Sequence, residues 1–279
     1  MIYLQHNIVI DIGMDLELLH MKNHKIKNLF VFWGMVLSLG ILAACDPVYE
    51  MTNCPSYVVC YVNLETIDLS AESSNPQCIV IEHGNDLPII SYGLRSTGTE
   101  KEKYDELCKK HNDLSYNQYR YLPTGPAIDY DSVTYNECDF TGISVTCDKA
   151  FDETHPAGEN LSDIVRFMSM SPYRYILSGY SEYYNYNESD VSDAFDTLMR
   201  IYINKDYFDS SVNNTCYPID ELLKDLTAED LTLNGYDAPG FIGMLYFERK
   251  PSEPGEYSIT VNIKTDDGRD LSDTILLQF

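Results

Sequence analysis

The sequence predicts a mainly β protein, a β-sandwich with short helical insertions. The strongest observation is the C-terminal segment 256–279, where two runs of alternating apolar and polar residues flank the dipeptide Asp267-Gly268. Strand side chains alternate between two faces, and Asp-Gly tolerates the positive φ angles of a tight hairpin turn. Runs rich in β-branched and aromatic residues predict further strands at 57–64 and 78–84. Helical spacing is confined to short segments.

Residues 21–44 have the parts of a secretory signal. Three lysines between Met21 and Asn28 precede an uncharged run, 29–44, that ends in small residues. This run is shorter than the roughly 20 residues that span a bilayer as a helix, so a retained signal anchor is the weaker alternative. Residues 1–20 carry acidic side chains where a signal begins basic. We interpret them as a misassigned upstream start.

The segment Leu42-Ala43-Ala44-Cys45 resembles the lipobox of bacterial lipoproteins. Together with the Tyr-, Asn- and Asp-rich chain that follows, it resembles uncharacterised lipoproteins of Bacteroidetes. The resemblance implies cleavage before Cys45, lipidation of its thiol, and anchoring in the cell envelope, usually in the outer membrane. Several acyl chains would hold the protein on the membrane durably, whereas one chain binds weakly. A structural cysteine beside an ordinary cleavage site is the alternative.

The composition excludes two kinds of partner. Removing residues 1–44 leaves 235 residues, enough for one large domain or two small ones, and keeps the whole net charge of −25. A chain this acidic is repelled by phosphate backbones, so we expect no nucleic-acid partner. Adhesion to anionic lipid through a basic patch is excluded for the same reason.

The elements follow in order along the mature chain. Residues 45–56 read as a tether, and 57–279 as the β-sandwich domain, with a subdivision considered near 122–134. One helical face in 100–112 is marked by Tyr104, Leu107, Cys108 and His111. Beyond the strands named above, the pattern predicts helices at 161–170 and 219–226, strands at 143–147 and 198–205, and a capped turn at 227–230.

The C-terminal hairpin, with the segment from Gly240 that precedes it, resembles the closing strands of an immunoglobulin-like sandwich. The resemblance covers about forty residues and implies that fold for the domain. The Cys-Trp-Cys signature of antibody domains is missing, since the one tryptophan lies in the signal.

Seven cysteines follow Cys45, and an odd number leaves at least one thiol unpaired. An exported compartment permits disulfides, so we expect one or two. Cys138 with Cys147, and Cys54 with Cys60, are the pairs closest in sequence.

Catalytic and metal-binding motifs are missing from the sequence, and we expect neither a cofactor nor a bound metal. Cys108 and His111 share a helix face and could form half a zinc site, but no second pair completes it. The aspartates around Gly268 suit a solvated hairpin turn better than a calcium site. The many acidic residues leave a carboxylate-based hydrolase as a remote alternative.

The tyrosines are the strongest indication of binding. Tyrosine offers a flat apolar face and a polar tip, which suits sugars and protein interfaces, although tyrosine also fills cores. The dense stretch from 173 to 186 supplies the candidate binding residues Tyr173, Tyr175, Tyr180, Tyr183, Tyr184 and Tyr186.

Asp131-Ser132-Val133 resembles the O-glycosylation acceptor of Bacteroidetes, with Ser132 as the modified residue. The leading prediction is a lipid-anchored envelope protein that binds or scaffolds and is not an enzyme. The second is a glycan-binding accessory lipoprotein. The expected partners are the membrane, through the N-terminal lipid, and a glycan or an envelope protein.

Overall fold

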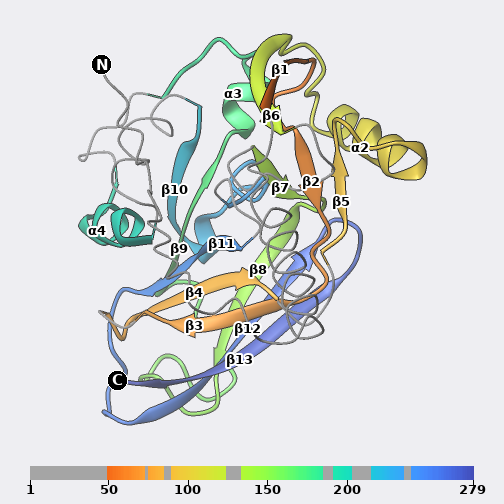
Figure 1. Cartoon of the computed structure of the whole chain (residues 1–279). Coiled ribbons are helices and arrows are strands. Elements are labelled where there is room, and N and C mark those ends of the chain that lie inside the picture. The colour runs from red at the N-terminus through yellow and green to blue at the C-terminus, as the bar shows by residue number, and fades with distance from the viewer. Residues whose placement is uncertain are drawn as a thin grey trace, which may run out of the picture. The chain divides into compact units, whose positions relative to one another are not determined.

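The computed structural model describes residues 49–72, 75–84, 89–123, 133–184, 191–202, 215–235 and 240–279. These residues form a mainly β structure, and 49–279 cluster as one unit (Figure 1). Within the described ranges, no helix combines the length and the apolar character needed to cross a bilayer.

A five-stranded antiparallel sheet lies at the centre. Its strands, in spatial order, are β10 (Tyr217–Leu222), β9 (Val165–Ser171), β11 (Phe241–Phe247), β4 (Cys78–His83) and β3 (Ile67–Ala71). Strands distant in sequence are neighbours here, with Met244 of β11 opposite both Val80 and Met168. Long-range pairing therefore builds this sheet.

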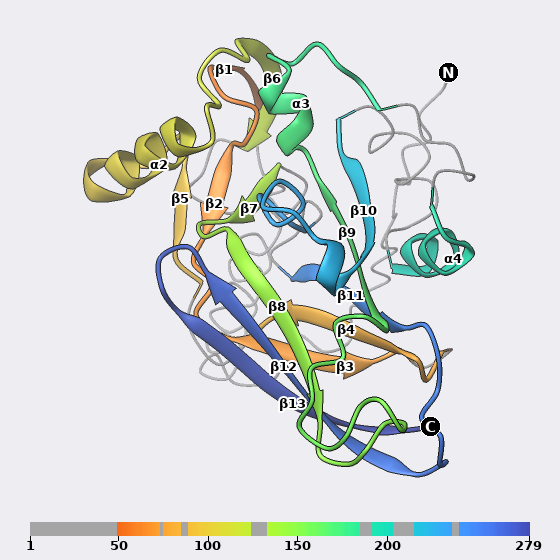
Figure 2. The same ribbon diagram turned by 180° about the vertical axis from the view of Figure 1, so that it is seen from behind.

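A second sheet holds the predicted C-terminal hairpin. It orders β13 (Asp270–Gln278), β12 (Glu256–Thr265) and β8 (Phe140–Cys147), and Figure 2 shows β12 and β13 as long neighbouring ribbons. Gly268 adopts a φ of 89° in the connecting turn, as the Asp-Gly dipeptide predicts. Burial alternates along β12 and β8, so one face of this sheet is apolar.

The apolar faces of these two sheets share one hydrophobic core. The five-stranded sheet contributes Ile79, Ile81, Val165, Phe167, Leu245 and Phe247, and the three-stranded sheet contributes Ile143, Val145, Tyr257, Ile259, Val261 and Ile263. The backbone amide of Leu69 donates to Asp273 Oδ2 at 2.9 Å, which joins β3 to β13 at the edge. The mainly β prediction is confirmed.

The opposite face of the five-stranded sheet is covered by helix α4 (Asp193–Tyr202). Phe195 and Leu198 of this helix pack against Met168, Met170 and Met244. Central strands of the sheet are therefore buried on both faces.

A third sheet supports helix α2 (Gly98–Lys110). It orders β5 (Ser91–Gly93), β2 (Cys60–Val62) and β7 (Thr134–Asn136), with β2 and β7 parallel. Tyr104, Leu107 and Cys108 of α2 pack into a tyrosine-rich cluster with Tyr61, and the following His111 is also buried. The predicted helical face is confirmed.

Strand β1 (Tyr49–Cys54) lies inside 45–56, where we expected a tether. It pairs antiparallel with β6 (Gln118–Pro123), and this pairing satisfies the backbone groups of β1 that face β6. A subdivision of the domain was considered near 122–134, and residues 124–132 of this segment lie outside the described residues.

Three local predictions are wrong. The helix expected at 161–170 is largely β9. Its sequence shows no alternation of apolar and polar residues because this strand is buried on both faces. The strand expected at 198–205 begins inside α4 instead. The helix expected at 219–226 is β10 followed by a short 3-10 helix, Leu223–Asp225. The turn at 227–230 is confirmed, since Asp230 Oδ2 accepts from the amide and hydroxyl of Thr227.

The disulfide prediction is also wrong within the described residues. Six of the seven cysteines are free thiols, namely Cys54, Cys60, Cys78, Cys108, Cys138 and Cys147. Five of these six side chains are buried, where a thiol packs as a small apolar group. Burial raises the pKa of Cys78 and Cys138 to about 12, which keeps both thiols protonated.

Candidate functional site

Three predicted site residues, Cys45, Ser132 and Tyr186, lie outside the described residues. The other five candidate tyrosines surround the short helix α3 (Tyr173–Leu177) and the segment that follows it. Tyr175 is buried and Tyr184 lines a cavity, whereas Tyr173 and Tyr180 are half-buried and Tyr183 is exposed.

One aromatic group centres on Tyr175, which is 1% exposed. Its ring meets those of Tyr57, Tyr180 and Tyr183 at centroid distances of 5.3, 5.8 and 5.2 Å, in edge-to-face or tilted orientations. Such pairs stabilise a core but present no flat common surface. Tyr175 is therefore a core residue and not part of an exposed platform.

A buried carboxylate fixes this group. Asp113 accepts the amides of Tyr57 and Val58 at 2.6 and 2.8 Å and the hydroxyl of Tyr180 at 2.8 Å. Desolvation raises the pKa of Asp113 although these hydrogen bonds favour the charged form. The guanidinium of Arg120 lies 4.7 Å from the ring centroids of both Tyr57 and Tyr116. The cluster is thus a rigid support.

The cavity lies beside β10 and has a volume of about 340 Å³. This is within the size range of small-molecule sites. Its lining comes from α3, the end of the tyrosine-rich stretch, the residues before α4, β10 and the turn after β10, namely Arg174, Tyr184, Val191, Tyr217, Pro218, Ile219, Asp220, Glu221 and Asp230.

Two tyrosine rings form the aromatic part of this cavity. The rings of Tyr184 and Tyr217 are 5.2 Å apart with an interplanar angle of 46°. The hydroxyl of Tyr217 donates to the carbonyl of Glu182 at 3.1 Å, which fixes the ring at its polar end. Burial, and then the charge of Glu182, raise the pKa of Tyr217, so its hydroxyl is protonated at neutral pH.

Arg174 is held at the cavity by two carboxylates. Its Nε donates to Glu229 at 2.6 Å, its Nη2 donates to Asp230 at 3.2 Å, and its guanidinium lies 5.8 Å from the Tyr217 ring centroid. Asp230 is in turn fixed by Thr227. The guanidinium is therefore oriented before any ligand arrives.

The side chain of Asp220, a second acid of the lining, is 7% exposed. Its Oδ2 accepts the amide of Ser192 at 2.5 Å, just before α4. Its Oδ1 accepts no hydrogen bond among the described residues, although Nη1 of Arg166 lies 3.4 Å away. The lining thus combines three carboxylates with one guanidinium, and it favours a neutral or cationic ligand over an anionic one.

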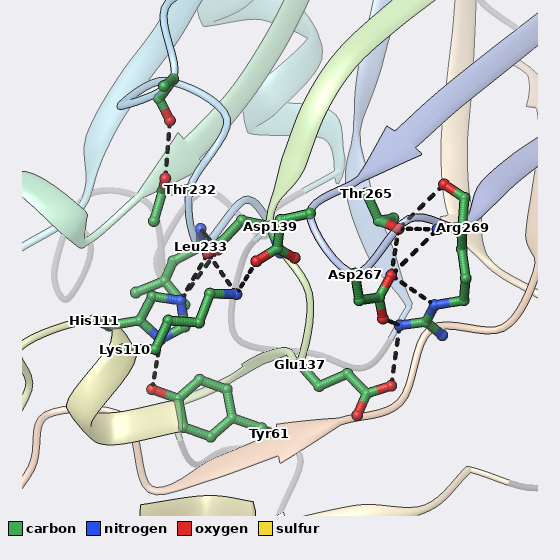
Figure 3. Close-up of polar contacts among 12 residues, drawn as sticks. Tyr61, Lys110, His111, Glu137, Asp139, Thr232, Leu233, Thr265, Asp267 and Arg269 are labelled. Atoms are coloured by element: carbon green, nitrogen blue, oxygen red, sulfur yellow. Dashed lines mark hydrogen bonds and ion pairs between the residues drawn. The ribbon is translucent and has the colours of Figure 1, made fainter. Parts of the chain in front are cut away.

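A second polar cluster surrounds His111 (Figure 3). Its Nδ1 is 3.2 Å from the hydroxyl of Tyr61 and its Nε2 is 3.0 Å from Asp139 Oδ2. Lys110 lies 2.7 Å from both Asp139 and Asp266. Through Lys110 the cluster joins α2 to the β12–β13 turn. Because Tyr61 and His111 are buried, the cluster offers no access to a substrate.

The alternative of half a zinc site at Cys108 and His111 finds no support in this geometry. Both ring nitrogens of His111 contact protein groups, and no cluster of metal-ligating side chains occurs in the part of the chain that the structure describes. The β12–β13 turn is likewise a hydrogen-bonded turn. Asp267 accepts from Thr265 and Arg269, and the Arg269 contact lowers its pKa to about 2.

Tyr217, Asp220 and Arg174 were missed as site residues. Arg174 stands inside the tyrosine-rich stretch, and that position was its one available signal. Tyr217 precedes the segment 219–226, which was expected to be a helix, and Asp220 lies within it. Because this segment is strand β10 instead, the sequence pattern did not predict that these residues lie near Tyr184. Comparison of the chain with protein-family models, curated proteins and solved structures found no match.

Proposed function

We propose that this chain is a lipid-anchored, non-enzymatic binding module of the cell envelope. In this proposal Cys45 carries the lipid, the outer membrane holds the anchor, and residues 57–279 form an immunoglobulin-like sandwich. The sequence Leu42-Ala43-Ala44-Cys45 supports the anchor, and two sheets with a common core support the sandwich.

The observation that carries the binding function is the cavity beside β10. A volume of about 340 Å³ with two aromatic rings and an oriented guanidinium is a built recognition surface. We assign the cavity binding and no reaction, since its guanidinium is already paired with Asp230 and its two tyrosine rings contact each other.

A carbohydrate is the ligand that the lining suits best, which is the second function expected from the sequence. Aromatic rings pack on the apolar faces of sugars, and the surrounding carboxylates and guanidinium pair with hydroxyl groups. Of the six tyrosines proposed at first, Tyr184 lines the cavity, and Tyr217 joins it. The acidic lining favours neutral or amino sugars over uronic acids.

The test is a glycan array probed with residues 46–279, followed by calorimetry on each hit. Tyr217→Ala removes one ring of the pair, so we expect affinity to fall at least about tenfold, or about 1.4 kcal/mol. Tyr119→Ala is the matched control, since Tyr119 is exposed on a different sheet. Silence across the array would contradict the carbohydrate proposal, and equal losses in both variants would contradict this site.

A further inference from the structure

The two-stranded sheet β1–β6 presents an apolar face to solvent. Met51 stands opposite Tyr121, and Asn53 stands opposite Tyr119. Directly opposed residues of antiparallel strands point to the same side, so these residues share one face. Met51, Tyr119 and Tyr121 are 58%, 69% and 66% exposed, and we call them the ribbon face.

The other face of the same ribbon is fixed to the domain. Cys54 and Leu122 are buried with Val59 in a small core of their own. Arg120 donates to the carbonyl of Tyr57 and to the hydroxyl of Tyr116, each at 2.9 Å, and its guanidinium lies 4.7 Å from both ring centroids. The ribbon is therefore anchored through one side, and its apolar face is held outward by the fold.

The ribbon is also electrically unlike the rest of the chain. Its two strands contain one acidic and one basic residue, Glu50 and Arg120, whereas the whole chain has a net charge of −25. Glu50 is paired with Arg95 at 2.7 Å. An anionic membrane surface repels most of this protein but meets no net charge here. Tyrosine is also enriched at the membrane–water interface, where its ring and hydroxyl meet matching surroundings.

The position of the ribbon in the chain indicates which surface its apolar face contacts. Tyr49, the first residue of β1, follows Cys45 by four residues. Four extended residues reach at most about 14 Å. If Cys45 carries the lipid, as the proposed function requires, β1 is the first structured element above the bilayer. No other strand of the described chain is tied so closely to the anchor.

We propose that the ribbon face lies on the bilayer at the level of the headgroups and sets the orientation of the domain. The acyl chains supply attachment, and Met51, Tyr119 and Tyr121 supply contact area that prevents free rotation about the tether. This inference rests on the proposed anchoring at Cys45.

The chain allows a direct test because its one tryptophan, Trp33, lies in the predicted signal and is absent from the mature protein. Tyr121→Trp then introduces a single fluorophore on the ribbon face, and Tyr119→Trp provides a second. Leu276→Trp is the matched control, since Leu276 is 61% exposed on β13. Each mature lipoprotein is reconstituted in phosphatidylcholine vesicles that carry bromine near the headgroup end of the acyl chains.

We expect bromine to quench the tryptophan at 121 or 119 several-fold more than the tryptophan at 276. Labelling of the same samples with palmitate separates the two proposals. Labelled protein with equal quenching at all three positions overturns the docking and leaves the anchor intact. A blue-shifted but unquenched tryptophan at 121 also overturns it, because a protein surface then covers the ribbon. Unlabelled protein overturns the anchoring itself.

Discussion

The hydroxyl of Tyr180 donates a hydrogen bond of 2.8 Å to Oδ1 of Asp113, a carboxylate without solvent exposure. Through this contact the tyrosine-rich stretch is joined to the segment that follows α2. The same carboxylate accepts the amides of Tyr57 and Val58. One side chain therefore ties together three parts of the chain that are distant in sequence.

Replacing Asp113 is predicted to be costly. Asp113→Ala leaves two buried amides and one hydroxyl without their acceptor, so the free energy of unfolding falls by about 3 kcal/mol. Tyr180→Phe removes one of the three bonds and costs about 1 kcal/mol. Urea unfolding of both variants measures this order. Asp105→Asn on the exposed surface of α2 is the control, with a change below about 0.5 kcal/mol. A loss for Asp113→Ala no larger than that of the control would contradict the assignment.

Two glycines provide a matched pair. A Cβ at Gly243 of β11 would lie 2.6 Å from Cε2 of the buried Phe167 and 3.0 Å from the carbonyl of Met168. Gly243→Ala therefore overpacks the core and lowers the free energy of unfolding by about 1–3 kcal/mol. A Cβ at Gly142 of β8 meets nothing within 4 Å, so Gly142→Ala changes stability by less than about 0.5 kcal/mol. Equal urea midpoints for the two variants would show that β11 does not approach β9 in this way.

His155 gives the fold a dependence on pH. Its Nδ1 and Nε2 lie 2.8 Å from Asp152 and Asp163, and both nitrogens donate only in the imidazolium form. Burial lowers the pKa of His155, but the two carboxylates outweigh burial and raise it above 6.5. Its folded pKa is raised, so this stabilisation is complete below pH 6.5 and is lost as pH rises through the folded value.

The contacts around His155 have the opposite effect on the pKa values of its two carboxylate partners, Asp152 and Asp163. Hydrogen bonds, led by Thr154 for Asp152 and by His155 for Asp163, lower the pKa of both acids. Their stabilisation is present above about pH 4 and is lost as pH falls through the lowered values. The urea midpoint of the wild type should decrease as pH rises above 6.5. In His155→Gln this decrease should be smaller or absent. An unchanged decrease in the variant would refute the role of His155.

The thiols give a prediction against our own expectation from sequence. Six cysteines are free, so denatured residues 46–279 should take up at least six alkyl groups without reductant. Intact mass spectrometry counts them, and reductant should leave the melting temperature unchanged. Three or fewer additions, rising after reduction, would mean that two or more disulfides form within residues 46–279.

The periodicity of apolar and polar residues predicted the helices and strands that have one buried face and one solvent-exposed face. The face of α2 from Tyr104 to His111 and the alternation of β12 were readable because a polar side faces solvent. β9 was not readable, because Val165 and Phe167 enter one core while Met168 and Met170 enter another. In α4, the spacing of Phe195 and Leu198 was obscured by apolar residues that alternate after Leu198.

The candidate site was only half predictable for a related reason. Tyr184 belongs to a stretch whose composition attracts notice, so its candidacy followed from sequence. Tyr217 reaches it because β10 pairs with β9, and Asp230 reaches Arg174 because of the turn after β10. Such pairings join segments tens of residues apart, and a periodic pattern records nothing about them.

The most direct test of the central claim is the mass of the N-terminal peptide of the protein purified from membranes. A binding module tied to lipid predicts a peptide that begins at Cys45 and carries a diacylglyceryl group on its sulfur. An N-terminal peptide that begins upstream of Cys45, or one that begins there without acyl chains, would contradict the account.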